Sequence, residues 1–223
     1  LKNWLIRDNR VKVITNKENI GLTKSLNVAI KIAQGEYIAR QDGDDISLPQ
    51  RFEKQIEFLE KHPEIMVLGT FGYIIDKQGD ILEKQILFTS SQEIKRELIK
   101  RNPFMHTSVM MKKEIIDRVG GYNERFKSSQ DYELWFRILK VVKGGNLPLF
   151  LIKKRYHTDM ISIKKDKDQL INTIFIQKQA IKNGDYSKFY YIYLLKYYLY
   201  LSCPGFLKVF FKKKNIFKKI YGE

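Results

Sequence analysis

An acidic turn between a strand and a helix constrains the fold of this chain more than any other feature. Residues 36–40 carry the short apolar stretch of a strand and run directly into Gln-Asp-Gly-Asp-Asp at residues 41–45. One helix pattern ends at Gly35, and Pro49 opens another. Strand and helix patterns alternate in this way through the first half of the chain, beginning with a strand at residues 10–15. This alternation predicts an α/β fold with a mixed, mainly parallel sheet flanked by helices.

Periodicity places further elements along the chain. Helices are predicted at residues 22–33, 49–61, 91–101, 113–119, 131–142 and 166–182, and strands at 65–70, 71–76, 107–111 and 149–156. Ser91 is the expected N-cap of its helix, and Gly120 with Gly121 closes the helix before them. A turn is predicted at residues 77–80, directly after the strand at 71–76.

The acidic turn is the strongest candidate for chemistry. Asp42 and Asp44 are two residues apart, so in an extended segment their side chains project the same way, and Gly43 lets the backbone turn tightly. Open α/β sheets bind ligands at the carboxyl ends of their strands, and Mg²⁺ and Mn²⁺ prefer carboxylate oxygens shared with substrate phosphates. The alternative is a solvated acidic turn in which Asp45 or Ser47 caps the next helix.

Two later positions add candidates. Asp131 falls at the start of a predicted helix, where the helix dipole stabilises a carboxylate. His157 follows a late strand and Arg155, and a neutral imidazole can bind a metal ion. The alternatives are a first-turn acid that serves only the helix and a surface histidine without a role.

Charge and aromatic residues concentrate at the C-terminal end. The 223-residue chain has a formal charge of +16, of which +7 lies in residues 186–223 together with 13 of the 29 aromatic residues. We therefore predict a boundary at the turn of residues 183–185, with an α/β domain at 1–183 and a helical, basic and aromatic tail at 184–223. Tyrosine-rich apolar surface beside lysines favours contact with an anionic membrane, and the alternative is a tail that packs on its own domain or on a second copy. The 13-residue apolar run at 189–201 is too short for a transmembrane helix, and one cysteine excludes a disulfide framework.

Several segments, taken in order, resemble the family 2 glycosyltransferases with their GT-A fold. The resemblance covers residues 8–160. It rests on Asn-Ile-Gly-Leu at 19–22, Gly-Glu-Tyr-Ile-Ala-Arg-Gln-Asp-Gly-Asp-Asp at 35–45, Leu-Pro-Gln-Arg-Phe at 48–52, Asn-Pro-Phe-Met-His-Thr-Ser-Val-Met at 102–110, Gly-Gly-Tyr at 120–122, Gln-Asp-Tyr-Glu-Leu-Trp at 130–135 and Arg-Tyr-His at 155–157.

The resemblance implies a donor site at the acidic turn. Asp44 would be the main ligand of a divalent cation, Mn²⁺ or Mg²⁺, with Asp45 as a supporting ligand and Asp42 nearer the nucleotide. His157 resembles a late histidine that reaches the metal or the diphosphate, and Arg155 would contact the pyrophosphate.

The resemblance also implies a catalytic base. Asp131 would remove the proton of the acceptor hydroxyl in a single, inverting displacement. Gln130 stands where the family usually has Glu, which keeps the hydrogen bonding and loses a charge. The residue that would be the base, Asp131, is still present. Trp135 is expected to pack under this turn, with sugar stacking as the alternative, and His106 is either an acceptor-side residue or a structural histidine.

The predicted protein is thus a metal-dependent sugar transferase that acts on a saccharide or lipid-linked acceptor. It would help make a surface polysaccharide or glycolipid in the cytoplasm, at the inner face of the cell membrane, with no nucleic acid as partner. The alternatives are a basic nucleic-acid-binding protein and a metal-dependent phosphoryl or nucleotidyl transferase. The family's base-binding strands have no counterpart before residue 8, so we expect the sheet to lack its first strand and the chain to be unstable and unable to select a nucleotide.

Overall fold

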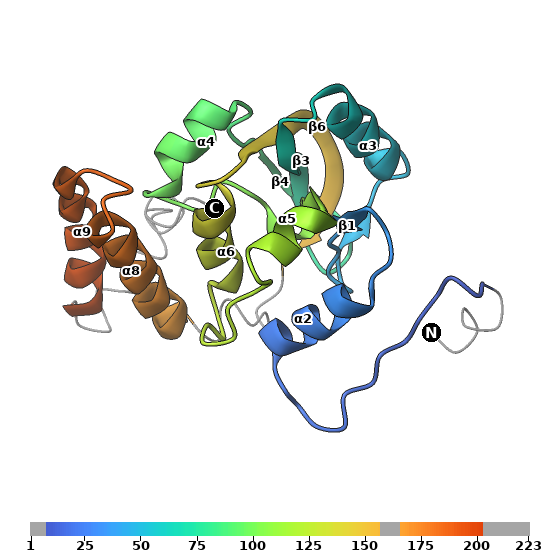
Figure 1. Ribbon diagram of the computed structural model, residues 1–223, viewed down its shortest axis with the longest axis horizontal. Helices are drawn as coiled ribbons and strands as arrows, with labels where there is room; N and C mark the ends of the chain where they lie inside the picture. Colours follow the sequence, from blue (N-terminus) through green and yellow to red (C-terminus); the bar gives the residue numbers. More distant parts are fainter. Residues whose placement is uncertain (1–7, 157–165, 203–223) are drawn as a thin grey trace.

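The computed structural model describes residues 8–156 and 166–202 (Figure 1). Strands and helices alternate along it, which confirms the predicted mixed α/β class. The elements are α2 (Leu22–Ile32), β1 (Tyr37–Ala39), β2 (Ile46–Ser47), α3 (Arg51–Lys61), β3 (Ile65–Ile75), β4 (Ile81–Gln85), α4 (Ser91–Leu98), η1 (His106–Ser108), β5 (Met110–Lys112), α5 (Lys113–Arg118), α6 (Gln130–Ile138), β6 (Lys143–Arg155), α8 (Asp166–Lys182), η2 (Lys188–Tyr190) and α9 (Tyr191–Ser202).

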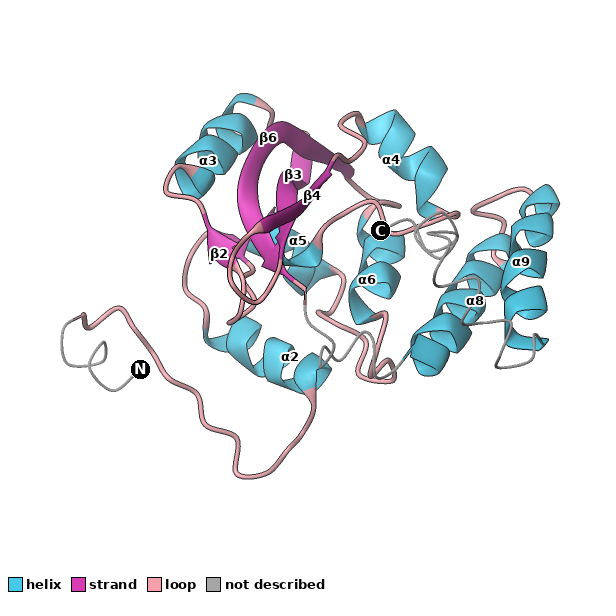
Figure 2. Ribbon diagram, turned by 180° about the vertical axis from the view of Figure 1, so that it is seen from behind, coloured by secondary structure: helices cyan, strands magenta, loops and turns pink. Residues whose placement is uncertain are grey.

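One curled sheet forms the centre of the molecule (Figure 2). Its strands lie in the order β1-β5-β3-β6-β2, and β4 pairs with the far end of β3. In the described part of the chain β3 and β6 are the parallel pair, while the other four pairings are antiparallel. The prediction of a mainly parallel sheet is therefore wrong for these residues.

Connection lengths and an unformed strand explain the difference. The short turn of residues 76–80 joins β3 to β4, and neighbours joined by so few residues must be antiparallel. Residues 10–15, predicted as the first strand, instead run outside the body as an extended loop (Figure 1). An alternating pattern without a neighbouring strand gains no ladder of hydrogen bonds, so it does not form a strand. β1 lies at one edge of the described sheet, and β2 lies at the other.

Two apolar layers cover the two faces of the sheet. Neighbouring residues of one strand point to opposite faces, so Val67 packs toward α4, α5, α6 and α8, whereas Leu68 packs toward α3. Trp135 of α6 is fully buried in the first layer and Leu59 of α3 in the second. Packing in these two layers holds the strands in place, and the acidic turn lies between two of them, β1 and β2.

Element boundaries follow the predictions with local exceptions. The helix at 166–182 is confirmed at both ends, and the two strands predicted at 65–70 and 71–76 form a single strand, β3. Ser90, not Ser91, caps α4, because its hydroxyl accepts the backbone N–H of Glu93. β6 begins at Lys143, six residues before the predicted strand, because Gly144 and Gly145 give no strand signal and yet pair with β3.

The described part of the aromatic tail packs on the α/β body. α9 lies beside α8 at the edge of the molecule (Figures 1 and 2), and Leu194 and Tyr197 of α9 join the core layer that contains Trp135. Within the described residues no helix combines the length and the apolar character needed to cross a bilayer. The predicted unit at 184–223 stays a prediction, and its residues 203–223 lie outside the described part.

Candidate active site

The acidic turn leaves the sheet between β1 and β2 and is held at its first carboxylate. The backbone N–H of Asp42 donates to Thr107 Oγ1 at 3.1 Å, and Arg40 Nη2 lies 2.5 Å from Asp42 Oδ1. Arg40 is 8% exposed, whereas the Asp42 side chain is half-buried. Asp42 is therefore tied to a buried guanidinium at the end of β1.

Arg155, the last residue of β6, fixes the other end of the turn. Its backbone N–H donates to Asp45 Oδ1 at 2.7 Å, and its Nε donates to the carbonyl oxygen of Asp44 at 3.1 Å. Its Nη1 donates to the carbonyl oxygens of Asp76 and Lys77 at 2.7 and 2.9 Å, which ties the turn to the loop after β3. Asp45 is half-buried, and burial raises the pKa of its carboxyl group. Asp44 is exposed.

A second buried arginine supports the turn from beneath. Arg51 of α3 is fully buried and donates to Gln41 Oε1, Ser47 Oγ, Gln55 Oε1 and the carbonyl oxygen of Arg40. Gln41 in turn donates from Nε2 to the carbonyl oxygen of Asp45 at 2.7 Å. Burial, followed by the nearby charge of Arg40, lowers the pKa of Arg51 to about 10, so it stays charged at neutral pH.

Asp131 lies in the first turn of α6, after a residue with unusual backbone geometry. Ser129 has φ 58°, the left-handed region that a non-glycine residue enters only when its surroundings hold it there. Its hydroxyl donates to the carbonyl oxygen of Gln169 at 3.1 Å, which anchors the turn on α8. Asn102 Nδ2 donates to Asp131 Oδ2 at 2.7 Å. Burial raises the pKa of Asp131, and hydrogen bonds from the backbone of Tyr132 and from Asn102 oppose that rise.

Arg40 connects the acidic turn to Asp131. Its charge acts on both Asp42 and Asp131, and both carboxylates also act on the ring of Tyr122. The Tyr122 hydroxyl lies 2.7 Å from His106 Nε2, and burial holds the pKa of His106 well below its usual value, so the imidazole is neutral. Asp42 and Asp131, 89 positions apart in the sequence, are thus both under the influence of the charge of one buried arginine.

The two aromatic candidates have structural partners. Trp135 is fully buried and packs edge-on against Phe104 with ring centres 5.2 Å apart, so it packs under the base turn and does not offer a face to a sugar. The ring of His106 packs against Trp135 at 6.0 Å, which agrees with its interpretation as a structural histidine.

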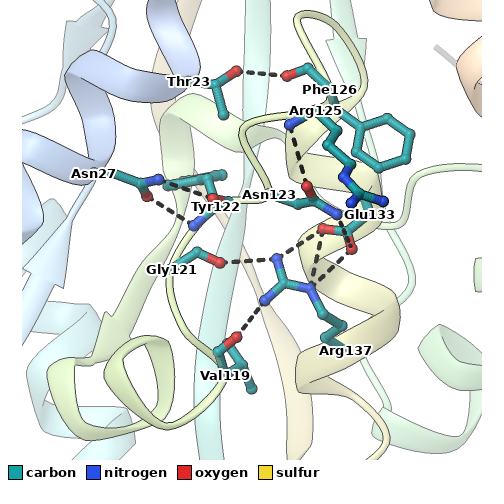
Figure 3. A network of polar contacts seen from close by, with 10 residues as sticks. All are labelled: Thr23, Asn27, Val119, Gly121, Tyr122, Asn123, Arg125, Phe126, Glu133 and Arg137. Atoms are coloured by element: carbon teal, nitrogen blue, oxygen red, sulfur yellow. Dashed lines mark hydrogen bonds and ion pairs between the residues drawn. The ribbon is translucent and has the colours of Figure 1, made fainter.

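A polar network holds the Gly120–Gly121 turn between α2 and α6 (Figure 3). Arg137 donates to the carbonyl oxygens of Val119 and Gly121 and pairs with Glu133 at 2.7 Å. Asn27 of α2 exchanges two hydrogen bonds with the backbone of Tyr122, at 2.8 and 2.9 Å. Gly121 has φ +72°, and a Cβ there would lie 2.8 Å from Asn27 Oδ1, so the close approach of α2 requires glycine. This network sets the position of Tyr122 beside the site.

Asp44 and Asp45 fit a divalent cation that is completed by a substrate. Mg²⁺ is commonly held by one or two carboxylates together with substrate phosphates. In the stretches that the structure describes, no three His, Cys, Asp or Glu side chains gather closely enough to hold a metal ion by themselves. His157, the remaining predicted ligand, lies outside the described residues.

Sequence reasoning assigned no role to Arg40, Asn102 or Arg51. Two signals were available. Arg40 is a basic residue between an apolar strand and an acidic turn, and Asn102 precedes Pro103 at the edge of an apolar stretch. The contact of Arg155 with a pyrophosphate stays a prediction. In the structure Arg155 donates four hydrogen bonds to the acidic turn and to the loop after β3.

Comparison with known proteins gives one family. The family model described as "Glycosyl transferase family 2" matches residues 1–120. The uncharacterized glycosyltransferase MJ1057 of Methanocaldococcus jannaschii is 34% identical over 82% of this chain and 63% of its own length. The putative glycosyltransferase EpsE of Bacillus subtilis is 33% identical, over 96% of this chain and 76% of that protein. The amylovoran biosynthesis glycosyltransferase AmsE of Erwinia amylovora is 34% identical over 69% of this chain and 57% of its own length. The chain therefore spans less than two thirds of two of these relatives.

Solved structures show the same fold. The crystal structure of S. aureus TarS 1-349 in complex with UDP-GlcNAc superposes with a TM-score of 0.62 at 17% identity, over 89% of this chain and 59% of that one. The mannosyltransferase PcManGT of Pyrobaculum calidifontis, in complex with GDP-Man and Mn²⁺, gives a TM-score of 0.57 at 14% identity, over 81% of this chain and 50% of that one. At this identity the likeness shows the fold alone, and it confirms the predicted GT-A architecture.

Proposed function

This chain belongs to glycosyl transferase family 2, and from that membership we propose that it transfers a sugar from a nucleotide-diphosphate sugar to a hydroxyl group of a saccharide or lipid-linked acceptor. The observation that carries the proposal is an acidic turn and a half-buried aspartate in the first turn of a helix, both of which the charge of the buried Arg40 influences. Two of the structural neighbours were solved with nucleotide sugars, and AmsE is named for polysaccharide synthesis, which supports a role in making a surface polysaccharide or glycolipid.

Asp131 is the general base of this proposal. The acceptor hydroxyl donates its proton to the carboxylate as its oxygen attacks the anomeric carbon of the donor. The hydrogen bond from Asn102 holds the carboxylate in one orientation, and the N-terminal end of α6 stabilises its charge before the proton arrives. A single displacement of this kind inverts the anomeric configuration.

Asp44 and Asp45 are the proposed residues for a divalent cation, Mn²⁺ or Mg²⁺, with His157 as a further ligand. When bound, the cation stabilises the negative charge of the departing diphosphate. Asp42, paired with Arg40, lies on the nucleotide side in this proposal, and Arg155 holds the loop that carries Asp44 and Asp45 in place.

Location at the inner face of the cell membrane is part of the same proposal. Residues 186–223 carry a charge of +7 and 13 aromatic residues, a composition that suits a peripheral contact with anionic lipid from the cytoplasmic side. Such a contact would place the enzyme beside lipid-linked acceptors.

Release of a nucleoside diphosphate tests the reaction. We expect the natural protein that contains this chain to release nucleoside diphosphate from a panel of UDP- and GDP-sugars when Mn²⁺ and an acceptor are present. Asp131→Asn and Asp44→Ala should each abolish transfer, while Asp117→Asn on the exposed side of α5 should not change it. Release of pyrophosphate from a nucleoside triphosphate instead would identify a nucleotidyl transferase. Undiminished transfer by Asp131→Asn would show that another residue is the base.

A further inference from the structure

The outward side of α9 is apolar although much of it is exposed in the described structure. Ile192, Leu195 and Leu199 are 58%, 54% and 64% exposed and lie at positions i, i+3 and i+7, so they share one face of the helix. We call this surface, with its exposed neighbours Tyr191 and Tyr198, the outer face of α9. The opposite side of the same helix is buried in the core. A helix that is apolar on both sides is typical of one that is covered on both sides.

The apolar surface continues onto α8. Ile171 and Phe175 are 46% and 51% exposed, and Lys178 follows them on the same side of this helix. Lys178 Nζ lies 5.6 Å from the ring centre of Tyr198, so the exposed sides of α8 and α9 meet at this pair. Figures 1 and 2 show the two helices side by side at the edge of the molecule, with no other described element outside them.

Three occupants could cover such a surface: a second copy of the chain, the chain's own residues 203–223, or a lipid bilayer. Charge separates them. The described part of α8 and of the segment that joins it to α9 has four exposed lysines and two exposed acids, and residues 203–223 add six more lysines and one acid, so the net charge of this region is positive. The exposed residues are Lys167, Lys178, Lys182, Lys188, Asp168 and Asp185. A second copy or the basic segment would bring like charges together around the apolar contact, which opposes association. An anionic bilayer accepts the apolar side chains and complements every one of these lysines.

We propose that the outer face of α9, together with Ile171 and Phe175 of α8, lies in the surface of an anionic membrane. The inference rests on the proposed function for its biological purpose. It names a surface in the described part of the protein, in addition to the basic segment 203–223. Apolar side chains supply attachment, and the surrounding lysines supply selectivity for negatively charged headgroups.

The same surface leads to the catalytic turn. Asn172, the neighbour of Ile171, donates from Nδ2 to the carbonyl oxygen of Ser128 at 3.0 Å, and the Ser129 hydroxyl donates to the carbonyl oxygen of Gln169 at 3.1 Å. The membrane-facing end of α8 is thus fastened to the turn that carries Asp131. This connection agrees with the lipid-linked acceptor of the proposed function.

Vesicle flotation of the whole chain tests the surface. Wild-type protein should float with vesicles of phosphatidylcholine and phosphatidylglycerol and much less with phosphatidylcholine alone. Leu195→Gln with Leu199→Gln keeps the charge and removes two apolar contacts, so binding should weaken about tenfold or more. Ile81→Gln with Leu82→Gln is the matched control, because these β4 residues are similarly exposed, at 54% and 58%, and lie on another element.

Each outcome decides the proposal. Binding that the α9 variant loses and the β4 variant keeps, with unchanged melting temperatures, supports it. Equal binding of all three proteins overturns it in favour of residues 203–223 as the sole membrane contact. A wild-type dimer in light scattering that the α9 variant converts to a monomer overturns it in favour of a second copy. Transfer to a water-soluble acceptor is measured separately, so a chain that binds vesicles without transferring sugar disproves the proposed reaction and leaves the membrane surface standing.

Discussion

Replacing Asn102 with alanine tests whether Asp131 acts as the general base. Asn102 Nδ2 lies 2.7 Å from Asp131 Oδ2 and stabilises the charged form of this carboxyl group. Burial already raises the pKa of Asp131, and the hydrogen bond from Asn102 opposes that rise. Asn102→Ala therefore raises the pKa of Asp131 further.

The size of the shift follows from the strength of one charge-assisted hydrogen bond. Such a bond contributes about 1.5–3 kcal/mol, and one pKa unit corresponds to about 1.4 kcal/mol, so the pKa of Asp131 should rise by about 1–2 units. Only the ionised carboxylate accepts the acceptor's proton. The acidic limb of the pH profile of kcat/KM should therefore move to higher pH by the same amount, and activity should be lost first at the acidic end.

The measurement is nucleoside diphosphate release across a pH series, with two comparison variants. Asn123→Ala removes an asparagine that contacts Glu133, a residue of the helix that also holds Asp131, at 3.4 Å. The acidic limb of the pH profile of this variant should stay in place. Asn102→Asp keeps an oxygen for the backbone N–H of Phe104 and sets a second carboxylate beside Asp131, so its limb should move furthest. An acidic limb that stays in place in both Asn102 variants, with the fold intact by circular dichroism, would refute Asp131 as the base.

Three further substitutions have defined outcomes. Arg51→Met should lower the free energy of unfolding by about 2–6 kcal/mol, measured by urea denaturation. The reason is that two buried acceptors, the carbonyl oxygen of Arg40 and Gln55 Oε1, each lose a hydrogen-bond donor. Gly121→Ala should lower the same quantity by about 1–3 kcal/mol, because φ is +72° and the new Cβ would meet Asn27 Oδ1 at 2.8 Å. An unchanged denaturation midpoint in either variant would contradict the stated reason. Asp44→Asn should raise the Mn²⁺ concentration needed for half-maximal transfer by about tenfold or more, and an equal requirement would remove Asp44 from the metal site.

Helices were predictable from the sequence because their signals are local. α2, α3 and α8 each carry apolar residues at helical spacing between recognisable ends, and the structure places them within two residues of expectation. Strands depend on partners that lie far away in the sequence. Residues 10–15 alternate as a strand does and form none, while Lys143–Arg155 includes two glycines and forms the longest strand in the described structure, because β3 lies beside it for nearly its whole length.

The candidate site divides along the same line. The acidic turn and Asp131 were found because each stands at the end of an element that local patterns predict. Asn102 was assigned no role, since its hydrogen bond to Asp131 spans 29 positions and exists only after α6 has packed beside the sheet. Arg40 was assigned none because its burial depends on the folded sheet, although its partner Asp42 is only two residues away. A site residue can be recognised from the sequence when its role follows from its position in a local element. When its role depends on a partner far away in the sequence, the structure is needed.

The three aspartates of the turn show why this distinction matters for mechanism. In sequence they are equivalent acids, yet the fold gives each a different surrounding. Asp42 is paired with the guanidinium of Arg40, Asp45 is half-buried against the backbone N–H of Arg155, and Asp44 is exposed. A cation at Asp42 would compete with the guanidinium of Arg40, so Asp42 is the least suited of the three to be the main metal ligand. Arg40 has a second consequence: its positive charge also acts on Asp131 and opposes the rise in the pKa of that carboxyl group that burial causes.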